Sequence, residues 1–177
     1  MEYNNVKFDA IIATPGCGKT YLCNKYPNKF VDADEIRMNI KYEIPKSLTR
    51  TEIENIRGNI TYNKRELSKP LWEVVYDVIE KEIKKGKIII ASPHPEFYKF
   101  FLDRKIPFCL VYADKCMKDE LTRRYRMRGN NEKLVTEFAK LFEEHYEDNK
   151  NDTRPNVKYA FTKDEYLEDI LNKFNVN

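Results

Sequence analysis

The most constraining feature of the sequence is a short loop near its start, residues 13–20, which reads Ala-Thr-Pro-Gly-Cys-Gly-Lys-Thr. This loop keeps the spacing of the phosphate-binding pattern Gly-x-x-x-x-Gly-Lys-Ser/Thr, with Ala13 in place of the first glycine. Gly16 and Gly18 allow the backbone to turn its N–H groups toward phosphate oxygens. An apolar segment precedes the loop and a helical pattern follows it, so the positive end of a helix would face the same anion.

Two side chains of this loop carry its chemistry. In loops of this kind the lysine, here Lys19, reaches the β- and γ-phosphates, and the hydroxyl of Thr20 ligates Mg²⁺. The sequence therefore predicts ATP and Mg²⁺ as cofactors, and a chance glycine-rich turn is the alternative interpretation. The residues expected to contact the nucleotide are Thr14, Pro15, Gly16, Cys17, Gly18, Lys19, Thr20 and Tyr21.

Strand-like segments alternate with helical patterns along the rest of the chain. Apolar strand-like segments occupy residues 7–13, 29–32, 87–91, 108–112 and 157–161, and helical patterns occupy residues 19–26, 71–84, 95–104, 116–128 and 132–146. Three of the apolar segments are near-continuous hydrophobic runs, which is typical of strands covered on both faces. We expect one domain, residues 1–177, with a five-stranded, mostly parallel sheet in a three-layer α/β fold. A final helix is expected to open with a capping box from Thr162 to Glu165.

Two regions are expected to lie outside this central sandwich. Residues 39–70 are more polar and less regularly patterned, which indicates a helical insertion on the side where kinases of this architecture bind the acceptor. In the region 115–148, residues 129–131 read Gly-Asn-Asn and separate two helical patterns, which is typical of a mobile helical lid.

Two aspartates follow the second strand-like segment. Asp32 and Asp34 would lie on one face of an extended segment, near the carboxyl edge of the sheet where ligands bind. Either carboxylate can accept the proton of an attacking hydroxyl or hold Mg²⁺ through water. Arg37 follows within one helical turn and could hold an anionic group of the acceptor. The alternative is that an aspartate here serves as a helix N-cap.

A cluster of arginines marks the expected lid. Arg124 and Arg128 are four residues apart and would share one helix face. Two guanidinium groups on one face can clamp transferring phosphates and neutralise charge in the transition state. A solvated basic helix face is the alternative.

Other nucleotide-binding classes lack their usual residues here. The apolar run at 88–91 ends in Ser92, where motor-type ATPases place a metal-holding aspartate. The segments 24–27 and 63–66 both begin Asn-Lys but lack the aspartate of the Asn-Lys-x-Asp base reader of GTPases. His94, just after Ser92, could contact the acceptor or could be a surface-loop histidine. The net charge of +3 is compatible with an anionic substrate and too small to require nucleic acid.

The loop at 15–20, the Asp34-x-x-Arg37 step and the Arg124-x-x-x-Arg128-Gly129 lid resemble the kinase domain of the bacteriophage polynucleotide 5′-kinase family. They also resemble small phage-encoded and adenylate-kinase-like nucleoside monophosphate kinases. The resemblance covers roughly residues 7–171 and implies a P-loop NTPase of the adenylate-kinase-like type. By this resemblance Lys19 and Thr20 would bind ATP and Mg²⁺, Asp34 would be the general base, Arg37 would grip an acceptor phosphate, and Arg128 would stabilise the transferring group with help from Arg124. The third-strand end differs from the polynucleotide kinases, which carry Asp-Thr-Asn where this chain has Ser92-Pro93-His94.

The sequence thus predicts an ATP-dependent phosphotransferase acting on a nucleotide-type acceptor, and the candidate substrate-binding residues are Asp32, Asp34, Arg37, Ser92 and His94. A nucleoside monophosphate is the first candidate acceptor, because the chain is small and only mildly basic. A polynucleotide or nucleoside 5′-hydroxyl is the second. A nucleotide-binding regulator or viral counter-defence protein with little turnover is the candidate from another class. We expect a cytoplasmic location, in the host cytoplasm if viral, with no membrane partner and no obligatory protein partner, because neither a secretion signal nor a membrane-length apolar run is recognisable.

Overall fold

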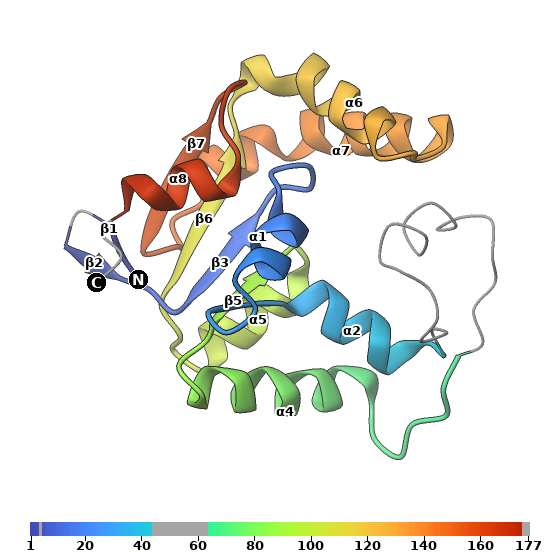
Figure 1. Ribbon diagram of the computed structural model, residues 1–177, viewed down its shortest axis with the longest axis vertical. Helices are drawn as coiled ribbons and strands as arrows, with labels where there is room; N and C mark the ends of the chain where they lie inside the picture. Colours follow the sequence, from blue (N-terminus) through green and yellow to red (C-terminus); the bar gives the residue numbers. More distant parts are fainter. Residues whose placement is uncertain (4, 44–63, 175–177) are drawn as a thin grey trace.

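The computed structural model describes residues 1–3, 5–43 and 64–174, which are built around a parallel sheet with strand order β4-β5-β3-β6-β7 (Figure 1). Its five strands are β3 (Ala10–Ala13), β4 (Phe30–Asp32), β5 (Ile88–Ala91), β6 (Phe108–Ala113) and β7 (Val157–Phe161). A separate antiparallel pair joins β1 (Glu2–Tyr3) to β2 (Val6–Lys7). The chain places β4 and β5 on one side of β3 and β6 and β7 on the other. Ligands of open α/β sheets bind at the carboxyl ends of the strands where the order reverses in this way.

The central strands are apolar on both faces because helices cover both. Successive side chains of a strand point to opposite faces, so Ile11 and Ala13 enter one core cluster while Ala10 and Ile12 enter the other. The helices are α1 (Lys19–Lys25), α2 (Ala33–Lys41), α4 (Leu71–Lys84), α5 (Pro95–Asp103), α6 (Lys118–Met127), α7 (Glu132–Asn151) and α8 (Leu167–Lys173), with a short 3₁₀ turn at Lys115–Met117. Side chains of α1, α6 and α8 pack in the first cluster, and those of α2, α4 and α5 pack in the second.

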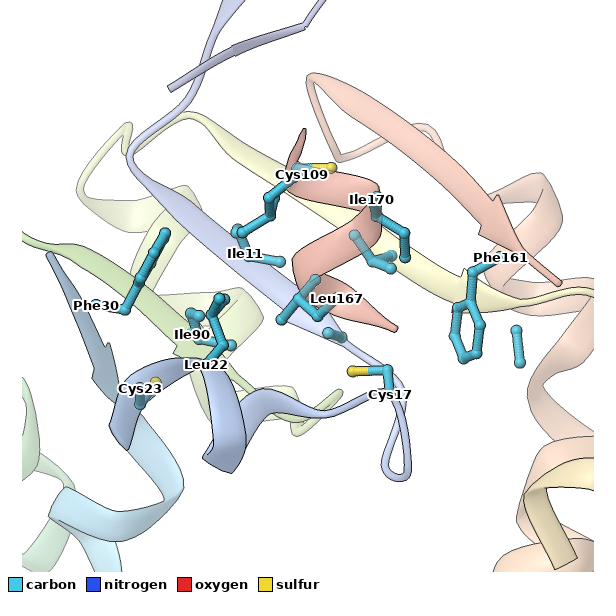
Figure 2. Packing of buried hydrophobic residues seen from close by; sticks show 14 of the residues in the cluster. Ile11, Cys17, Leu22, Cys23, Phe30, Ile90, Cys109, Phe161, Leu167 and Ile170 are labelled. Atoms are coloured by element: carbon cyan, nitrogen blue, oxygen red, sulfur yellow. The ribbon is translucent and has the colours of Figure 1, made fainter. Parts of the chain in front are cut away.

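Figure 2 shows how the first cluster reaches the loop between β3 and α1. Cys17 of the loop is fully buried and lies close to Leu167, the first residue of α8. The backbone N–H of Leu167 donates to the carbonyl of Cys17 at 2.7 Å. The start of α8 therefore fastens the loop to the core from a segment 150 residues away in the sequence.

The expected α/β class and five-stranded sheet are confirmed, and the sheet is parallel throughout. The helix expected at 71–84 has the bounds of α4. The strand expected at 7–13 is divided, because Val6–Lys7 pairs with β1 and Ala10–Ala13 pairs with the main sheet. Helix α7 runs to Asn151, beyond the expected end at 146.

The capping box expected at Thr162 is wrong as the start of the last helix. The Glu165 carboxylate does accept hydrogen bonds from the backbone and hydroxyl of Thr162, at 2.7 and 2.9 Å. The helix begins later, at Leu167, where the N–H of Tyr166 donates to Asp169 at 2.8 Å. The residues from Thr162 to Glu165 therefore form a turn between β7 and α8.

Part of the expected insertion at 39–70 can be followed. Helix α2 extends into it as far as Lys41, and Tyr42 pairs with Lys64 in an isolated antiparallel bridge. Residues 44–63 lie outside the described residues. Among the residues that are described, no helix is both long and apolar enough to span a membrane.

Candidate functional site

The loop between β3 and α1 needs its two glycines. Gly16 and Gly18 have φ angles of 88° and 97°, a left-handed conformation that side chains with a Cβ rarely adopt. A Cβ on Gly16 would also lie only 3.0 Å from Leu121 and Tyr125. Ala13, where the pattern has its first glycine, is instead the last residue of β3, paired with Val111, and has no positive φ. Its methyl group therefore causes no backbone strain.

Lys19 is buried and folds back over its own loop. Its Nζ donates to the carbonyl of Ala13 at 2.8 Å and lies 3.4 Å from that of Thr14. The loop is fixed to β6 by the N–H of Ala113, which donates to the Thr14 hydroxyl at 3.3 Å. A cationic group is thus held at the mouth of a fixed loop, within reach of any anion that the loop receives.

A cavity of about 320 Å³ opens beside the loop at the carboxyl ends of the strands. Most of the side chains that the sequence singles out line it together: Lys19, Thr20, Asp32, Asp34, Arg37, Ser92 and Arg128, with Pro15 and Gly16 of the loop. His94 and Arg124 do not line it, and neither do Thr14, Cys17, Gly18 and Tyr21. Three cationic and two carboxylate side chains therefore converge on one space.

The aspartates do not share one face of an extended segment, because helix α2 begins at Ala33 and Asp34 lies in its first turn. Asp32 is the N-cap, and its Oδ1 accepts from the N–H groups of Asp34 and Glu35 at 3.0 and 3.2 Å. The N-cap alternative is therefore correct for Asp32. Asp34 is held differently: its carboxylate accepts from the Ser92 N–H at 2.9 Å and from the Ser92 hydroxyl at 2.6 Å.

Arg37 and Arg128 carry unused hydrogen-bonding capacity into this cavity. The Nε atom of Arg37 is buried without a hydrogen-bond partner, and its guanidinium lies 5.9 Å from the centre of the Trp72 ring. Arg128 caps the end of α6, and within residues 1–3, 5–43 and 64–174 its side chain makes no ion pair or hydrogen bond. A buried donor without a partner is costly unless a ligand or water satisfies it.

Arg124 does not line the cavity, and its guanidinium is engaged by other parts of the protein. Its Nε donates to Glu120 at 2.8 Å, and its Nη atoms donate to the carbonyls of Gly16, Lys163 and Glu165 at 3.4, 2.6 and 3.2 Å. Its guanidinium also lies 4.0 Å from the centre of the Tyr166 ring. The expectation that both arginines face one phosphate clamp does not match this placement, because Arg124 joins α6, the loop and the β7–α8 turn instead.

His94 is the N-cap of α5 and lies outside the cavity. Its Nδ1 accepts from the N–H of Glu96 at 3.2 Å, and its ring lies 4.8 Å from that of Trp72. Burial, and then the charge of Arg37, lower the pKa of His94. The imidazole is therefore neutral at pH 7, with its proton on Nε2.

The cavity offers few direct metal ligands. Among the residues that can be described, no group of three or more His, Cys, Asp or Glu side chains could hold a metal ion. Thr20 and Asp32 do line the same cavity, so its walls include one hydroxyl and one carboxylate that could contribute to a metal site. That donor set fits Mg²⁺, which keeps several waters and uses one or two protein oxygens beside substrate phosphates.

Cys17 behaves as a core residue. Burial raises the pKa of its thiol above the ordinary value, so the thiol stays protonated and weakly reactive. Sequence reasoning missed four residues that line the cavity: Met38 of α2, Asn130 between α6 and α7, and Leu134 and Phe138 of α7. No sequence pattern indicates these residues. The ion pair between Glu120 and Arg124, in contrast, could have been predicted, because the two residues are four apart on one helix.

Comparisons with known proteins give little guidance. No family model matches the chain, and no curated protein matches it. Among solved structures, an uncharacterized protein from Eubacterium ventriosum ATCC 27560 aligns with a TM-score of 0.49 and 13% identity over 92% of each chain. We base no assignment on this likeness.

Proposed function

We propose that this protein is an adenylate-kinase-like P-loop phosphotransferase that moves the γ-phosphoryl group of ATP to a nucleotide-type acceptor. The observation that carries the proposal is the cavity that Lys19, Arg37 and Arg128 line together with Asp34. Phosphoryl transfer needs little besides positioning and neutralisation of charge on the transferring group. Several cations and one carboxylate around a glycine-rich loop supply both.

The loop would hold the donor. Gly16 and Gly18 give the loop its left-handed turns, and the N-terminus of α1 adds its positive end. Lys19 would exchange the carbonyls of Ala13 and Thr14 for the β- and γ-phosphates. Thr20 and Asp32 would hold Mg²⁺, which neutralises phosphate charge when bound.

The two arginines of the cavity would divide the remaining charge. Arg128 would stabilise the transferring phosphoryl, since it lies at the end of α6 beside the loop. Arg37 would bind an anionic group of the acceptor and so satisfy its buried Nε. Arg124 would act as a positioning residue that fixes α6 to the carbonyl of Gly16. A nucleoside monophosphate is the first candidate acceptor, because a small anion suits a cavity of about 320 Å³ with three cations.

A hydroxyl acceptor is the second candidate, and the Asp34–Ser92 contact favours it. A phosphate acceptor is already anionic and needs no base, whereas a hydroxyl must lose its proton. In that reaction the acceptor oxygen bonds to the γ-phosphorus, the bond from that phosphorus to the bridging oxygen of ADP breaks, and Asp34 takes the hydroxyl proton.

Use of ATP would also place the protein in the cytoplasm.

The test is transfer from γ-labelled ATP with Mg²⁺ to a panel of nucleoside monophosphates, nucleosides and 5′-hydroxyl oligonucleotides. Labelled diphosphates support the first candidate. Label on nucleosides or oligonucleotides alone overturns it and supports the second. Tight ATP binding without any transfer would contradict both and favour a nucleotide-binding regulator.

A further inference from the structure

A second pocket, of about 540 Å³, adjoins the cavity that contains Asp34. Pro15, Ser92 and Phe138 line both spaces. Ser92 is also the residue that holds the Asp34 carboxylate. A molecule whose reacting oxygen lies at Asp34 can therefore extend past Ser92 into the second pocket.

The walls of this second pocket are largely aromatic. Tyr98, Tyr125, Phe142 and Tyr146 line it together with Phe138. The Tyr146 ring lies 6.2 Å from Phe142, and the Phe138 ring lies 4.9 Å from Tyr125. A pocket of several hundred cubic ångströms with apolar walls and a few polar groups is typical of a small-molecule site. Flat aromatic walls favour a flat ring, because ring faces stack.

The charge of the second pocket differs from that of the cavity. Arg154, the one arginine among the described residues that line the pocket, forms a two-point ion pair with Asp152 at 2.8 and 2.9 Å and stacks on Tyr98 at 4.2 Å. His145, at the rim, lies 3.5 Å from Asp148. With its arginine paired to a carboxylate, this pocket is suited to an uncharged ring and not to a phosphate.

Polar groups at the edge can recognise such a ring. The amide of Asn149 offers both donors and an acceptor, and Asp148 beside it offers acceptors. His94 lines the same pocket as a neutral ring with its proton on Nε2. These groups match the alternating donors and acceptors on the edge of a nucleobase.

We propose that the second pocket binds the heteroaromatic base of the acceptor, while the cavity at Asp34 and Arg37 receives its reacting oxygen and its anionic group. This inference rests on the proposed phosphotransferase function and assigns the base of the acceptor to a particular place in the fold. The donor base would lie elsewhere, because the pocket lies on the Ser92 side of the loop, next to the carboxylate that faces the acceptor.

The decisive variants lie on α7. Leu141 lines the pocket and is 45% exposed, so Leu141→Trp fills the pocket without disturbing the core. Tyr146→Leu keeps an apolar side chain but removes a stacking ring. Lys140→Trp is the matched control, because the Lys140 side chain is 76% exposed and does not line the pocket. Thermal melts of all three variants would establish that each is folded.

For the acceptor that the label panel identifies, Leu141→Trp and Tyr146→Leu should raise KM by about tenfold or more. The Kd for ATP and the affinity for ribose 5-phosphate, which has no base, should stay as in the wild type. Lys140→Trp should resemble the wild type throughout. An unchanged acceptor KM in both pocket variants would overturn the inference and leave the proposed function intact.

Calorimetric titration with nucleosides in the absence of ATP separates the two proposals. Binding to the wild type that Leu141→Trp abolishes supports the base pocket even if no phosphoryl transfer occurs. Equal binding to the wild type and Leu141→Trp, or none to the wild type, places any base elsewhere and contradicts the inference even if transfer is efficient.

Discussion

Ser92 donates both its backbone N–H and its hydroxyl to the carboxylate of Asp34, at 2.9 and 2.6 Å. The contact joins the residue after β5 to the first turn of α2, 58 residues apart in the sequence. Because each carboxylate oxygen has a partner, the side chain of Asp34 is fixed in the cavity. Its orientation does not depend on an incoming acceptor.

Replacing Asp34 tests its assigned role directly. If Asp34 takes the acceptor proton, Asp34→Asn should lower kcat by about 100-fold or more while the Kd for ATP stays within about twofold. Ser92→Ala removes one of the two hydrogen bonds and should lower kcat by about tenfold. Transfer kinetics and ATP titration measure both. Full activity of Asp34→Asn with a hydroxyl acceptor would remove the base assignment, and full activity with a monophosphate would indicate that no base is needed.

Substitution of Arg124 should mainly lower stability, whereas substitution of Arg128 should mainly lower activity. Arg124→Ala leaves Glu120 with Arg123 alone and the carbonyls of Gly16, Lys163 and Glu165 without this donor, and it should lower the free energy of unfolding by about 1–3 kcal/mol. Arg128→Ala should change it by less than about 0.5 kcal/mol, because Arg128 has no ion pair in the described part of the chain. It should still lower kcat strongly.

Urea unfolding and transfer assays on the two variants make the comparison. The reverse pattern, a stable Arg124→Ala with low kcat and an unstable Arg128→Ala, would restore the idea that Arg124 contacts phosphate.

The sequence predicted the structure best where local side-chain patterns determine it. Buried strands such as Ile88–Ala91 and the amphipathic α4 follow from side-chain patterns, and Gly16 and Gly18 follow from the loop they form. The role of Arg124 could not be read in this way. Its carbonyl partners come from the loop and from the β7–α8 turn, which only the tertiary fold brings together.

The two aspartates illustrate a different limit. Asp32 and Asp34 are close in sequence, and either could have capped α2. Because helix α2 begins at Ala33, Asp32 is its N-cap. The carboxylate of Asp34 instead accepts hydrogen bonds from Ser92. A shift of two residues in the helix boundary would exchange their roles, and boundaries of this kind are poorly fixed by local sequence.

Acid should weaken the ion pairs of helix α6. Hydrogen bonds from Arg123 and Arg124 lower the pKa of Glu120 to about 2. A carboxyl with a lower pKa in the folded chain stabilises the fold above its unfolded pKa of about 4.3, and this contribution is lost as the pH falls toward 2. The free energy of unfolding should therefore fall in that window, and fall less steeply in Glu120→Gln, which should also be less stable at pH 7. Parallel slopes for the two proteins would contradict the ion pair.

Thiol labelling should distinguish the four cysteines. Cys17, Cys23 and Cys109 are buried, and Cys116 is exposed. Burial raises the pKa of Cys17 and Cys109, the latter to about 12. A thiol reagent should modify Cys116 first in the native protein and reach the others only on unfolding. Peptide mapping after brief labelling provides the measurement, and rapid native modification of Cys17 would contradict a buried loop.

The central claim is that the glycine-rich loop presents a triphosphate for transfer, and Lys19 carries that claim most directly. The measurement is transfer of label from γ-labelled ATP, with the best acceptor of the panel, by the wild type and by Lys19→Ala at equal folded concentration. We predict transfer by the wild type and a loss of about 100-fold or more in Lys19→Ala. Transfer that survives Lys19→Ala unchanged, or a wild type that binds ATP and transfers nothing, would contradict the account.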